Sequence, residues 1–274
     1  MKTKTMSGKV CLITGASQGI GRHCAHVLAE AGATVIVTSL KSEMGKLELL
    51  VDEITKKGGK AIAFDLDVTD YKQFEGKIAE IIKETGQIDV LINNAGVSYY
   101  SRFFDITEND CDSHLDVNLK GAFFLAQAVA KQMVAQKIDG SIINIGSIAG
   151  LQAKKYALPF CVSKAGLAHL TKVMAYELVE YNIRVNSMSL GLFPTELVTD
   201  YIASEAGQKF IEQIPLKRPA RLEELNGPLL LLASRASSYM TGSTIEIDGG
   251  FAIDIFLHEN LDTSNPSQNS FFKK

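Results

Sequence analysis

The stretch KVCLITGASQGIGRHCAHVLAEAG, residues 9–32, decides the fold that we expect for this chain. It begins with a short apolar run, KVCLIT, which is typical of a buried strand. Gly15, Gly19 and Gly21 follow, and an amphipathic segment then predicts a helix that ends at Gly32. Glycines allow a tight turn, and backbone amides at the start of a helix attract phosphate groups. A strand, a glycine-rich loop and a helix in this order predict a site for the pyrophosphate of a dinucleotide.

The alternation of strand and helix continues along the chain. The first predicted strand is at residues 9–14. Further runs rich in β-branched residues predict strands at 34–39, 61–68, 89–94, 141–147, 183–189 and 244–248. Amphipathic segments between them predict helices at 19–32, 45–58, 71–86, 108–136 and 159–182. The strands are mostly apolar on both faces, which is typical of parallel strands covered by helices. We therefore expect an α/β fold with a doubly wound, Rossmann-type parallel sheet of about seven strands and helices on both faces.

No internal repeat or linker divides the chain, so we expect a single domain over residues 1–257. Within it, residues 192–226 predict a helical excursion that could cover a substrate. The polar, turn-rich tail at 258–274 is expected to be extended or disordered.

The composition narrows the possible partners and the compartment. The net charge of −3 gives no reason to expect nucleic acid or an acidic membrane. The four cysteines are scattered without metal-ligand spacing, which indicates reduced thiols and neither a disulfide framework nor a metal site. The apolar runs are too short to span a bilayer, and the N-terminus does not look like a signal peptide, so we expect a cytoplasmic protein.

Several short motifs together resemble those of the short-chain dehydrogenase/reductase family. The glycine spacing of TGASQGIG is similar to the TGxxxGxG signature of that family. NNAG (93–96), DVNLKG, INIGS, SKAG, LGLFPT and DGG follow in the family's order, so that the resemblance covers about residues 7–252. It implies an oxidoreductase, similar to the 3-oxoacyl reductases, that transfers a hydride between NADP or NAD and a small carbonyl or secondary alcohol.

The resemblance also implies which residues hold the cofactor. They are Gly15, Ser17, Gln18, Gly19, Ile20, Gly21, Ser39, Lys41, Asp67, Val68, Asn94, Ala95, Gly96, Lys164, Gly191 and Thr195. Independently of the family, Gly15, Ser39, Asp67, Asn94, Ser147 and Gly191 each lie at or just past the end of a predicted strand. Open α/β sheets bind ligands beyond the carboxyl ends of their strands, so these residues are expected to share one edge.

The preference between NADP and NAD depends on the end of the second strand. NAD sites usually carry an acid there, about 20 residues past the glycines. This chain has Ser39 instead, with Lys41 nearby, and Lys41 could pair with a 2′-phosphate, which favours NADP. Lys41 could equally be a solvated loop charge, and Asp67, which by resemblance lies at the adenine with Val68, could be a plain turn residue.

The family's catalytic residues are Ser, Tyr, Lys and Asn, and three of these are matched, by Ser147, Lys164 and Asn118. Phe160 occupies the tyrosine position, thirteen residues after Ser147 and four before Lys164. Phenylalanine can neither donate nor accept a proton, and general acid–base catalysis contributes roughly 10²–10⁴-fold. We therefore expect the activity of this chain to be strongly reduced. A change of chemistry, a natural loss of activity and a deliberate exchange of tyrosine for phenylalanine all fit.

Other groups could replace the missing hydroxyl. Tyr156 lies eight residues before Lys164, which fits no spacing of the family, and Cys161 points away around the helix. Water could also act as the acid beside Ser147 and Lys164. A second departure is Leu190, which precedes Gly191 where the family usually has proline.

Two hypotheses about function remain open. The first is an impaired oxidoreductase; the second is a catalytically silent dinucleotide-binding protein that acts as a sensor or scaffold. By resemblance, the helices at 108–136 and 159–181 would form a homotetramer or a homodimer. The aromatic cluster in VSYYSRFF (97–104) could line an apolar substrate pocket, or could pack in the core or against another subunit.

Overall fold

The structure is a computed structural model that describes residues 5–196 and 198–253. In these residues, seven parallel strands form one sheet in the order β3-β2-β1-β4-β5-β6-β7. The strands are β1 (Val10–Thr14), β2 (Thr34–Ser39), β3 (Lys60–Asp65), β4 (Val90–Asn93), β5 (Ser141–Ser147), β6 (Arg184–Leu190) and β7 (Thr244–Ile247). The doubly wound parallel sheet predicted from the sequence is confirmed.

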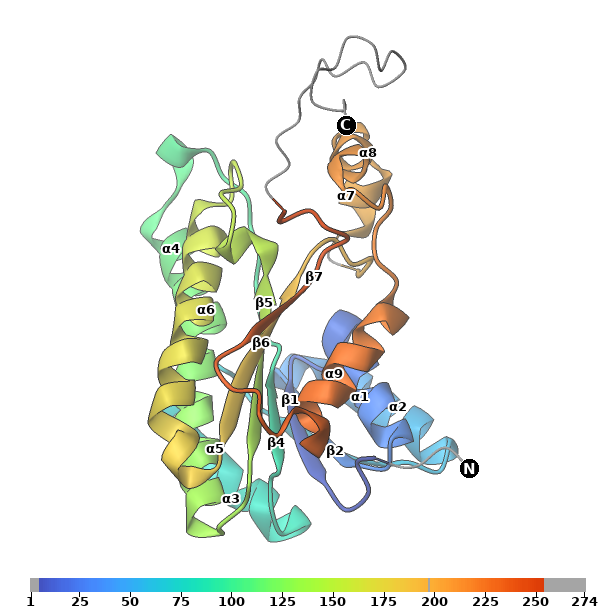
Figure 1. Cartoon of the computed structure of the whole chain (residues 1–274), viewed down its shortest axis with the longest axis vertical. Helices are drawn as coiled ribbons and strands as arrows, with labels where there is room; N and C mark the ends of the chain where they lie inside the picture. The colour runs from blue at the N-terminus through green and yellow to red at the C-terminus, as the bar shows by residue number, and fades with distance from the viewer. Residues whose placement is uncertain (1–4, 197, 254–274) are drawn as a thin grey trace, which may run out of the picture.

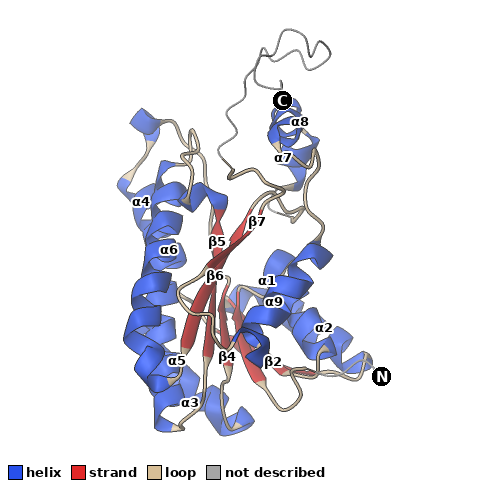
Figure 2. Cartoon of the chain, in the orientation of Figure 1, coloured by secondary structure: helices blue, strands red, loops and turns tan. Residues whose placement is uncertain are grey.

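Helices cover both faces of the sheet (Figure 1, Figure 2). They are α1 (Gly19–Glu30), α2 (Met44–Lys56), α3 (Phe74–Thr85), α4 (Glu108–Leu115), α5 (Ala122–Ala135), α6 (Leu158–Leu178), α7 (Thr199–Ala203), α8 (Glu205–Gln213) and α9 (Asn226–Ala233). One face is covered by α1, α2 and α9, and the other by α3, α5 and α6 (Figure 1).

Side chains of β1 alternate between these two cores, as the period of a strand requires. Cys11 and Ile13 pack with α1, α2 and α9, whereas Val10 and Leu12 pack with α3, α5 and α6. All five residues of β1 are buried. A central strand that is apolar on both faces is therefore the reason that this stretch predicts a sheet with two covered faces.

The expected helix at 108–136 is not continuous. A π-helical turn, Asp116–Gly121, separates α4 from α5. Gly121 lies in this turn against the chain after β3, where a β-carbon would come 2.6 Å from the carbonyl oxygen of Val68. The turn therefore packs on a segment that is distant in the chain.

Other boundaries shift by a few residues. The third strand ends at Asp65 and not at Val68, so Asp67 and Val68 lie in the turn that follows. Residues 71–73 form a 3₁₀ turn before α3, and residues 179–181 form another after α6. The tail expected at 258–274 lies outside the described residues.

The expected excursion at 192–226 contains α7, α8 and a 3₁₀ turn at Leu222–Leu225. The two short helices stand apart from the helices that cover the sheet (Figure 1). That this segment covers a substrate remains a prediction. Nowhere in residues 5–196 and 198–253 is a helix both long enough and apolar enough to cross a bilayer.

Candidate active site

The glycine-rich loop after β1 packs closely on the segment that follows β4. Gly15 has a φ of +62°, and a β-carbon on it would lie 2.9 Å from the Cα of Ala95. A β-carbon on Gly21 would lie 2.4 Å from the carbonyl oxygen of Gly15. Only glycine fits at these positions, so the backbone itself forms the surface of the loop.

The first turn of α1 is suited to an anion. The residue before the helix, Gln18, makes no side-chain hydrogen bond to the turn, and the turn contains no acidic residue. The first amides of a helix lack intrahelical partners and carry a partial positive charge. This cradle of glycines and helix amides fits the pyrophosphate of a dinucleotide.

Thr14 and Asn94 hold the loop in this shape. The Thr14 Oγ1 accepts hydrogen bonds from the backbone N–H groups of Asn94 and Ala95, both at 3.0 Å. In return, the Asn94 Nδ2 donates to the carbonyls of Thr14 (2.8 Å) and Gly15 (3.0 Å). Asn94, a predicted cofactor residue, therefore acts on the loop with its side chain. Thr14 was missed from the sequence, although the TG dipeptide of the glycine motif was a usable signal.

The ends of β2 and β3 lie side by side, with Ser39 paired to Asp65. The Ser39 hydroxyl donates to the Ser17 Oγ at 3.3 Å, and Lys41 is exposed two residues further on. The Asp65 carboxylate is bound by Lys77 at 2.8 Å, and this hydrogen bond lowers the pKa of Asp65. The acid beside Ser39 is thus already paired.

The structure gives Asp67 and Val68 different roles. The Asp67 Oδ1 accepts hydrogen bonds from the N–H and the hydroxyl of Thr69, so Asp67 builds the turn after β3 and is exposed. Val68 is 9% exposed and packs in the core. The turn places both just past the end of β3, where the sequence predicted a contact with adenine.

Lys164 and Phe160 lie together on α6, next to β5. The buried Lys164 Nζ donates to the carbonyl oxygen of Ile145 at 2.8 Å. Burial lowers the pKa of Lys164 from 10.5 to about 8. The same ammonium lies 5.9 Å from the centre of the Phe160 ring. The lysine is therefore placed beside a ring that has no hydroxyl.

Ser147 ends β5, two residues after Ile145, and faces the start of the turn that leads to α6. Its Oγ accepts a hydrogen bond from the backbone N–H of Ala149 at 3.2 Å, which leaves the hydroxyl proton available for another acceptor. The turn packs on α6, since a β-carbon on Gly150 would lie 2.7 Å from the carbonyl carbon of Lys164. Ser147 and Lys164 thus belong to one compact site.

Asn118, in the π-helical turn, joins α6 to the segment after β4. Its Oδ1 accepts the N–H of Val97 at 2.8 Å, and its Nδ2 donates to the Val97 carbonyl and to the Ser163 Oγ, both at 3.0 Å. A β-carbon on Gly96 would lie 3.2 Å from this Oδ1 and 3.7 Å from the Lys164 Nζ. Gly96, Asn118 and Lys164 are therefore neighbours, as the predicted site requires.

His114 packs against Phe160 and was missed from the sequence. The two ring centres are 6.3 Å apart, and His114 is 1% exposed. Its Nε2 accepts the backbone N–H of Tyr99 at 3.1 Å, and its Nδ1 donates to the carbonyl of Asp110 at 2.6 Å. Both nitrogens are used within the protein, so His114 does not supply the missing proton.

The two other candidates for the missing acid lie elsewhere. Tyr156 is 50% exposed, and its ring lies 5.2 Å from the Lys155 ammonium. The Cys161 thiol faces the carbonyl of Lys154 at 3.9 Å. The contacts of these two side chains are thus with Lys155 and Lys154, whereas the Phe160 ring lies beside the Lys164 ammonium.

The predicted cover, residues 192–226, begins next to the glycine-rich loop. A β-carbon on Gly19 would lie 3.2 Å from the Thr195 Cγ2, and one on Gly191 would lie 2.7 Å from the Cα of Asp248. Between α1 and this segment is a pocket of about 440 Å³, lined by Gly19, Arg22, His23, His26, Pro194, Thr195, Glu196, Thr199 and Leu222. Thr195 thus stands at the predicted cofactor edge. Leu190, in place of the family's proline, is buried in β6.

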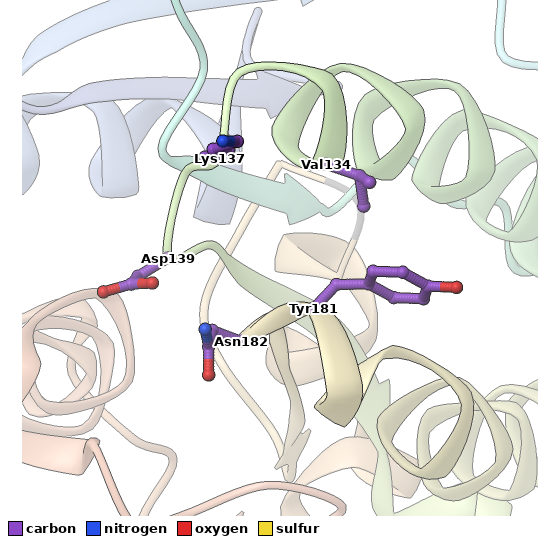
Figure 3. A pocket seen from close by; sticks show the side chains of 5 residues that line it. All are labelled: Val134, Lys137, Asp139, Tyr181 and Asn182. Carbon is purple, nitrogen blue, oxygen red and sulfur yellow. The ribbon is translucent and has the colours of Figure 1, made fainter.

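A second pocket has a volume of about 280 Å³, and Figure 3 shows the side chains that line it. It is lined by Val134, Lys137, Asp139, Tyr181 and Asn182. These residues precede β5 and β6, so the pocket is at the amino edge of the sheet. Ligands of open α/β sheets bind at the carboxyl edge, and we therefore place the active site there.

Comparisons with known proteins agree with this geometry. A family model described as enoyl-(acyl carrier protein) reductase matches residues 15–252. The 3-oxoacyl-[acyl-carrier-protein] reductase FabG of Thermotoga maritima is 39% identical over 90% of this chain and 99% of its own length. The chain belongs to the short-chain dehydrogenase/reductase family.

Solved structures of short-chain dehydrogenases/reductases share its fold. A short-chain type dehydrogenase/reductase from Mycobacterium marinum has a TM-score of 0.85 and 43% identity, over 91% of this chain and 97% of that one. A gluconate 5-dehydrogenase from Burkholderia cenocepacia, in complex with NADP and tartrate, has a TM-score of 0.87 and 33% identity, over 92% and 98% of the two chains. The resemblance inferred from the motifs is confirmed, and the chain is by family an NAD(P)-dependent oxidoreductase.

Proposed function

We propose that this short-chain dehydrogenase/reductase interconverts a small carbonyl compound and a secondary alcohol, and that Phe160 impairs its proton transfer. The observation that carries the proposal is the buried Lys164 ammonium, fixed by Ile145 beside a ring without a hydroxyl. The bound nicotinamide supplies or accepts the hydride. The protein contributes the binding surface and the polar groups around the reacting carbon.

The retained residues divide this work. The Ser147 hydroxyl donates a hydrogen bond to the substrate oxygen, because its own Oγ already accepts from Ala149. The Lys164 ammonium stabilises negative charge on that oxygen and holds the nucleotide ribose. Asn118 positions both walls of the site through Val97 and Ser163. A proton for the alkoxide must come from water.

Restoring the hydroxyl tests this assignment. We expect Phe160→Tyr to raise turnover of a ketone panel by about 10²–10⁴-fold, the usual contribution of general acid–base catalysis. Phe160→Leu is the control, since it replaces the aromatic ring by another apolar side chain without adding a hydroxyl. The assay is nicotinamide absorbance with the parent chain and both variants side by side.

The competing function is a catalytically silent dinucleotide-binding sensor or scaffold. It predicts that Phe160→Tyr binds coenzyme normally but reduces no member of the panel. The intact contacts of Ser147, Asn118 and Lys164 favour the oxidoreductase. If neither NADPH nor NADH binds in a fluorescence titration, both functions are wrong.

NADP is the proposed coenzyme in preference to NAD. Ser39 and Ser17 offer hydroxyls at the end of β2, the nearby Asp65 is paired with Lys77, and Lys41 is exposed there. We expect Lys41→Glu to weaken NADPH binding at least about fivefold more than NADH binding, because a carboxylate repels a 2′-phosphate. Lys83→Glu, on α3, is the control for a change of net charge.

Self-association is part of the proposal. Apolar residues remain exposed along α6 and just after it: Val162 (54%), Val173 (44%), Tyr176 (85%) and Val179 (53%). A second copy of the chain, packed on this helix, would bury them and give the homodimer or homotetramer expected from the family. The cytoplasmic location expected from the composition stays a prediction.

A further inference from the structure

The side chain of Lys154 lies near three aromatic rings, one from the segment after β4 and two from the α7–α8 pair. Its Nζ lies 4.9 Å from the ring centre of Tyr100, 5.5 Å from that of Tyr201 and 5.4 Å from that of Phe210. It also donates a hydrogen bond to the Tyr100 hydroxyl at 3.1 Å. A cation within about 6 Å of a ring centre is attracted to the face of the ring. Lys154 thus joins three parts of the molecule.

Two of these parts are loops that follow strands of the sheet. Lys154 lies in the segment between β5 and α6, and Tyr100 lies in the segment after β4. The two segments are tied together, because the N–H of Ser101 donates to the carbonyl of Tyr156 at 2.9 Å. The Lys154 carbonyl itself accepts the N–H of Ala157 at 3.3 Å. The base of the lysine is therefore fixed between Ser147 and Phe160.

The third part is the α7–α8 pair, which supplies Tyr201 and Phe210. α7 has 5 residues and α8 has 9, too few to be stable without tertiary contacts. Phe210 stacks on Phe251 with ring centres 4.7 Å apart, and this attaches the pair to the chain that follows β7. Lys154 supplies a second contact, which joins the pair to the segment between β5 and α6.

We propose that Lys154 is a positioning residue, which holds the α7–α8 pair against the segments that carry Ser147 and Phe160. That the α7–α8 pair lies over the substrate rests on the proposed function. The contact between Lys154 and the pair does not depend on that function. The neighbouring Lys155 provides a matched comparison. Its ammonium lies 5.2 Å from the ring centre of Tyr156, within its own segment, and joins nothing to the cover.

Hydrogen exchange of the full-length protein without coenzyme tests the contact. Lys154→Met keeps the length and apolar stem of the side chain but removes the charge, and we expect amide exchange in residues 199–213 to rise about tenfold. Lys154→Arg should keep the parent rate, because a guanidinium also binds ring faces. Lys155→Met should leave it unchanged. Equal exchange in Lys154→Met and Lys155→Met would overturn the proposal.

Kinetics in the Phe160→Tyr background test the position over the substrate. Ethyl acetoacetate and cyclohexanone serve as probes, with NADPH as the hydride donor. We expect Lys154→Met to raise KM for the reduced probe about tenfold with kcat changed less than twofold, and Lys154→Arg to restore it. The Kd of NADPH should not change, because its predicted contacts lie along the sheet edge.

The outcomes separate the two claims. Raised amide exchange with an unchanged KM means that Lys154 holds the α7–α8 pair but that the pair does not contact the substrate. This result overturns the positioning role. Raised exchange in a Phe160→Tyr protein that reduces neither probe and no other ketone supports the contact and contradicts the proposed function. Unchanged exchange in Lys154→Met overturns the inference whatever the enzyme does.

Discussion

At the scale of single residues, Lys164 sets catalysis against stability. Its ammonium is buried, and the one hydrogen bond to Ile145 replaces only part of the water that it loses. Burial lowers its pKa from 10.5 to about 8, so folding disfavours the charge that the proposed function needs at neutral pH.

We predict that Lys164→Met stabilises the protein at pH 7. Below pH 8 the lysine is charged in both folded and unfolded chains, so the cost of burial is fully present. Between pH 8 and 10.5 the unfolded chain binds the proton and the folded chain does not, so the stability of the parent rises with pH. Urea unfolding should show a gain on the order of 2 kcal/mol at pH 7, after the lost hydrogen bond is subtracted.

The difference between variant and parent should shrink at pH 9.5, and coenzyme affinity should fall at both pH values. A difference that does not depend on pH would show that the lysine titrates normally. Lys172→Met, on the exposed side of α6, is the control for the loss of a positive charge.

Which residues could be predicted follows from the kind of contact they make. Phe160 and Lys164 were found because their spacing on one helix is a local pattern. His114 and Ser163 act through hydrogen bonds to other segments of the chain, and no local pattern encodes such bonds. For Asp67 the sequence left two alternatives, a contact with adenine by resemblance and a turn residue, and its hydrogen bonds to Thr69 place it in the turn.

At the scale of elements, the π-helical turn contains Asn118. We predict that Asn118→Leu lowers the free energy of unfolding by about 1–3 kcal/mol, because the partly buried N–H and carbonyl of Val97 lose their partners. Asn118→Asp keeps an acceptor for the N–H but no donor for the carbonyl, and it should lie between the parent and the leucine variant. Chemical denaturation of the three proteins measures the series; equal midpoints would contradict it.

Glycines in helices allow a matched pair of substitutions. At Gly21, in α1, a β-carbon would lie 2.4 Å from the Gly15 carbonyl oxygen and 2.5 Å from the Asn94 Nδ2. We predict that Gly21→Ala displaces the glycine-rich loop and weakens NADPH binding at least about tenfold, a loss comparable to other misplaced binding groups.

Gly76, in α3, has no atom within 4 Å of such a β-carbon. Gly76→Ala should therefore leave NADPH binding unchanged and raise stability by up to about 1 kcal/mol, the difference in helix propensity. Titration and thermal unfolding of both variants check the pair. Equal loss of binding in the two would mean that the loop does not contact the coenzyme.

The elements themselves were largely predictable. All seven predicted strands occur in the described residues, because a buried parallel strand is a continuous apolar run. The third strand was drawn too long, since Leu66 and Val68 stay buried after the strand has ended. The break between α4 and α5 was missed, because the apolar pattern continues through the π-helical turn.

At the scale of the whole molecule, α6 exposes the apolar side chains of Val162, Val173 and Tyr176. We predict that light scattering gives two or four times the mass of one 29.8 kDa chain. Val173→Asp with Tyr176→Asp should lower the mass to that of a monomer, because two buried carboxylates cannot be paired across a symmetric apolar interface. Tyr239→Asp, at a fully exposed position outside α6, should not change it. A parent chain of monomer mass would refute the assembly.

The place of β7 at the edge of the sheet has a consequence for synthesis. β6 is complete when Leu190 has left the ribosome, but its partner β7 and the Asp248 against which Gly191 packs are made much later. During that interval the nascent chain contains β1 to β6, and the edge of β6 that pairs with β7 is unpaired. An unpaired strand edge is prone to aggregation and is a site that chaperones protect. A chain that stops before β7 would contain Ser147, Phe160 and Lys164, but it would lack the Asp248 segment against which Gly191 packs.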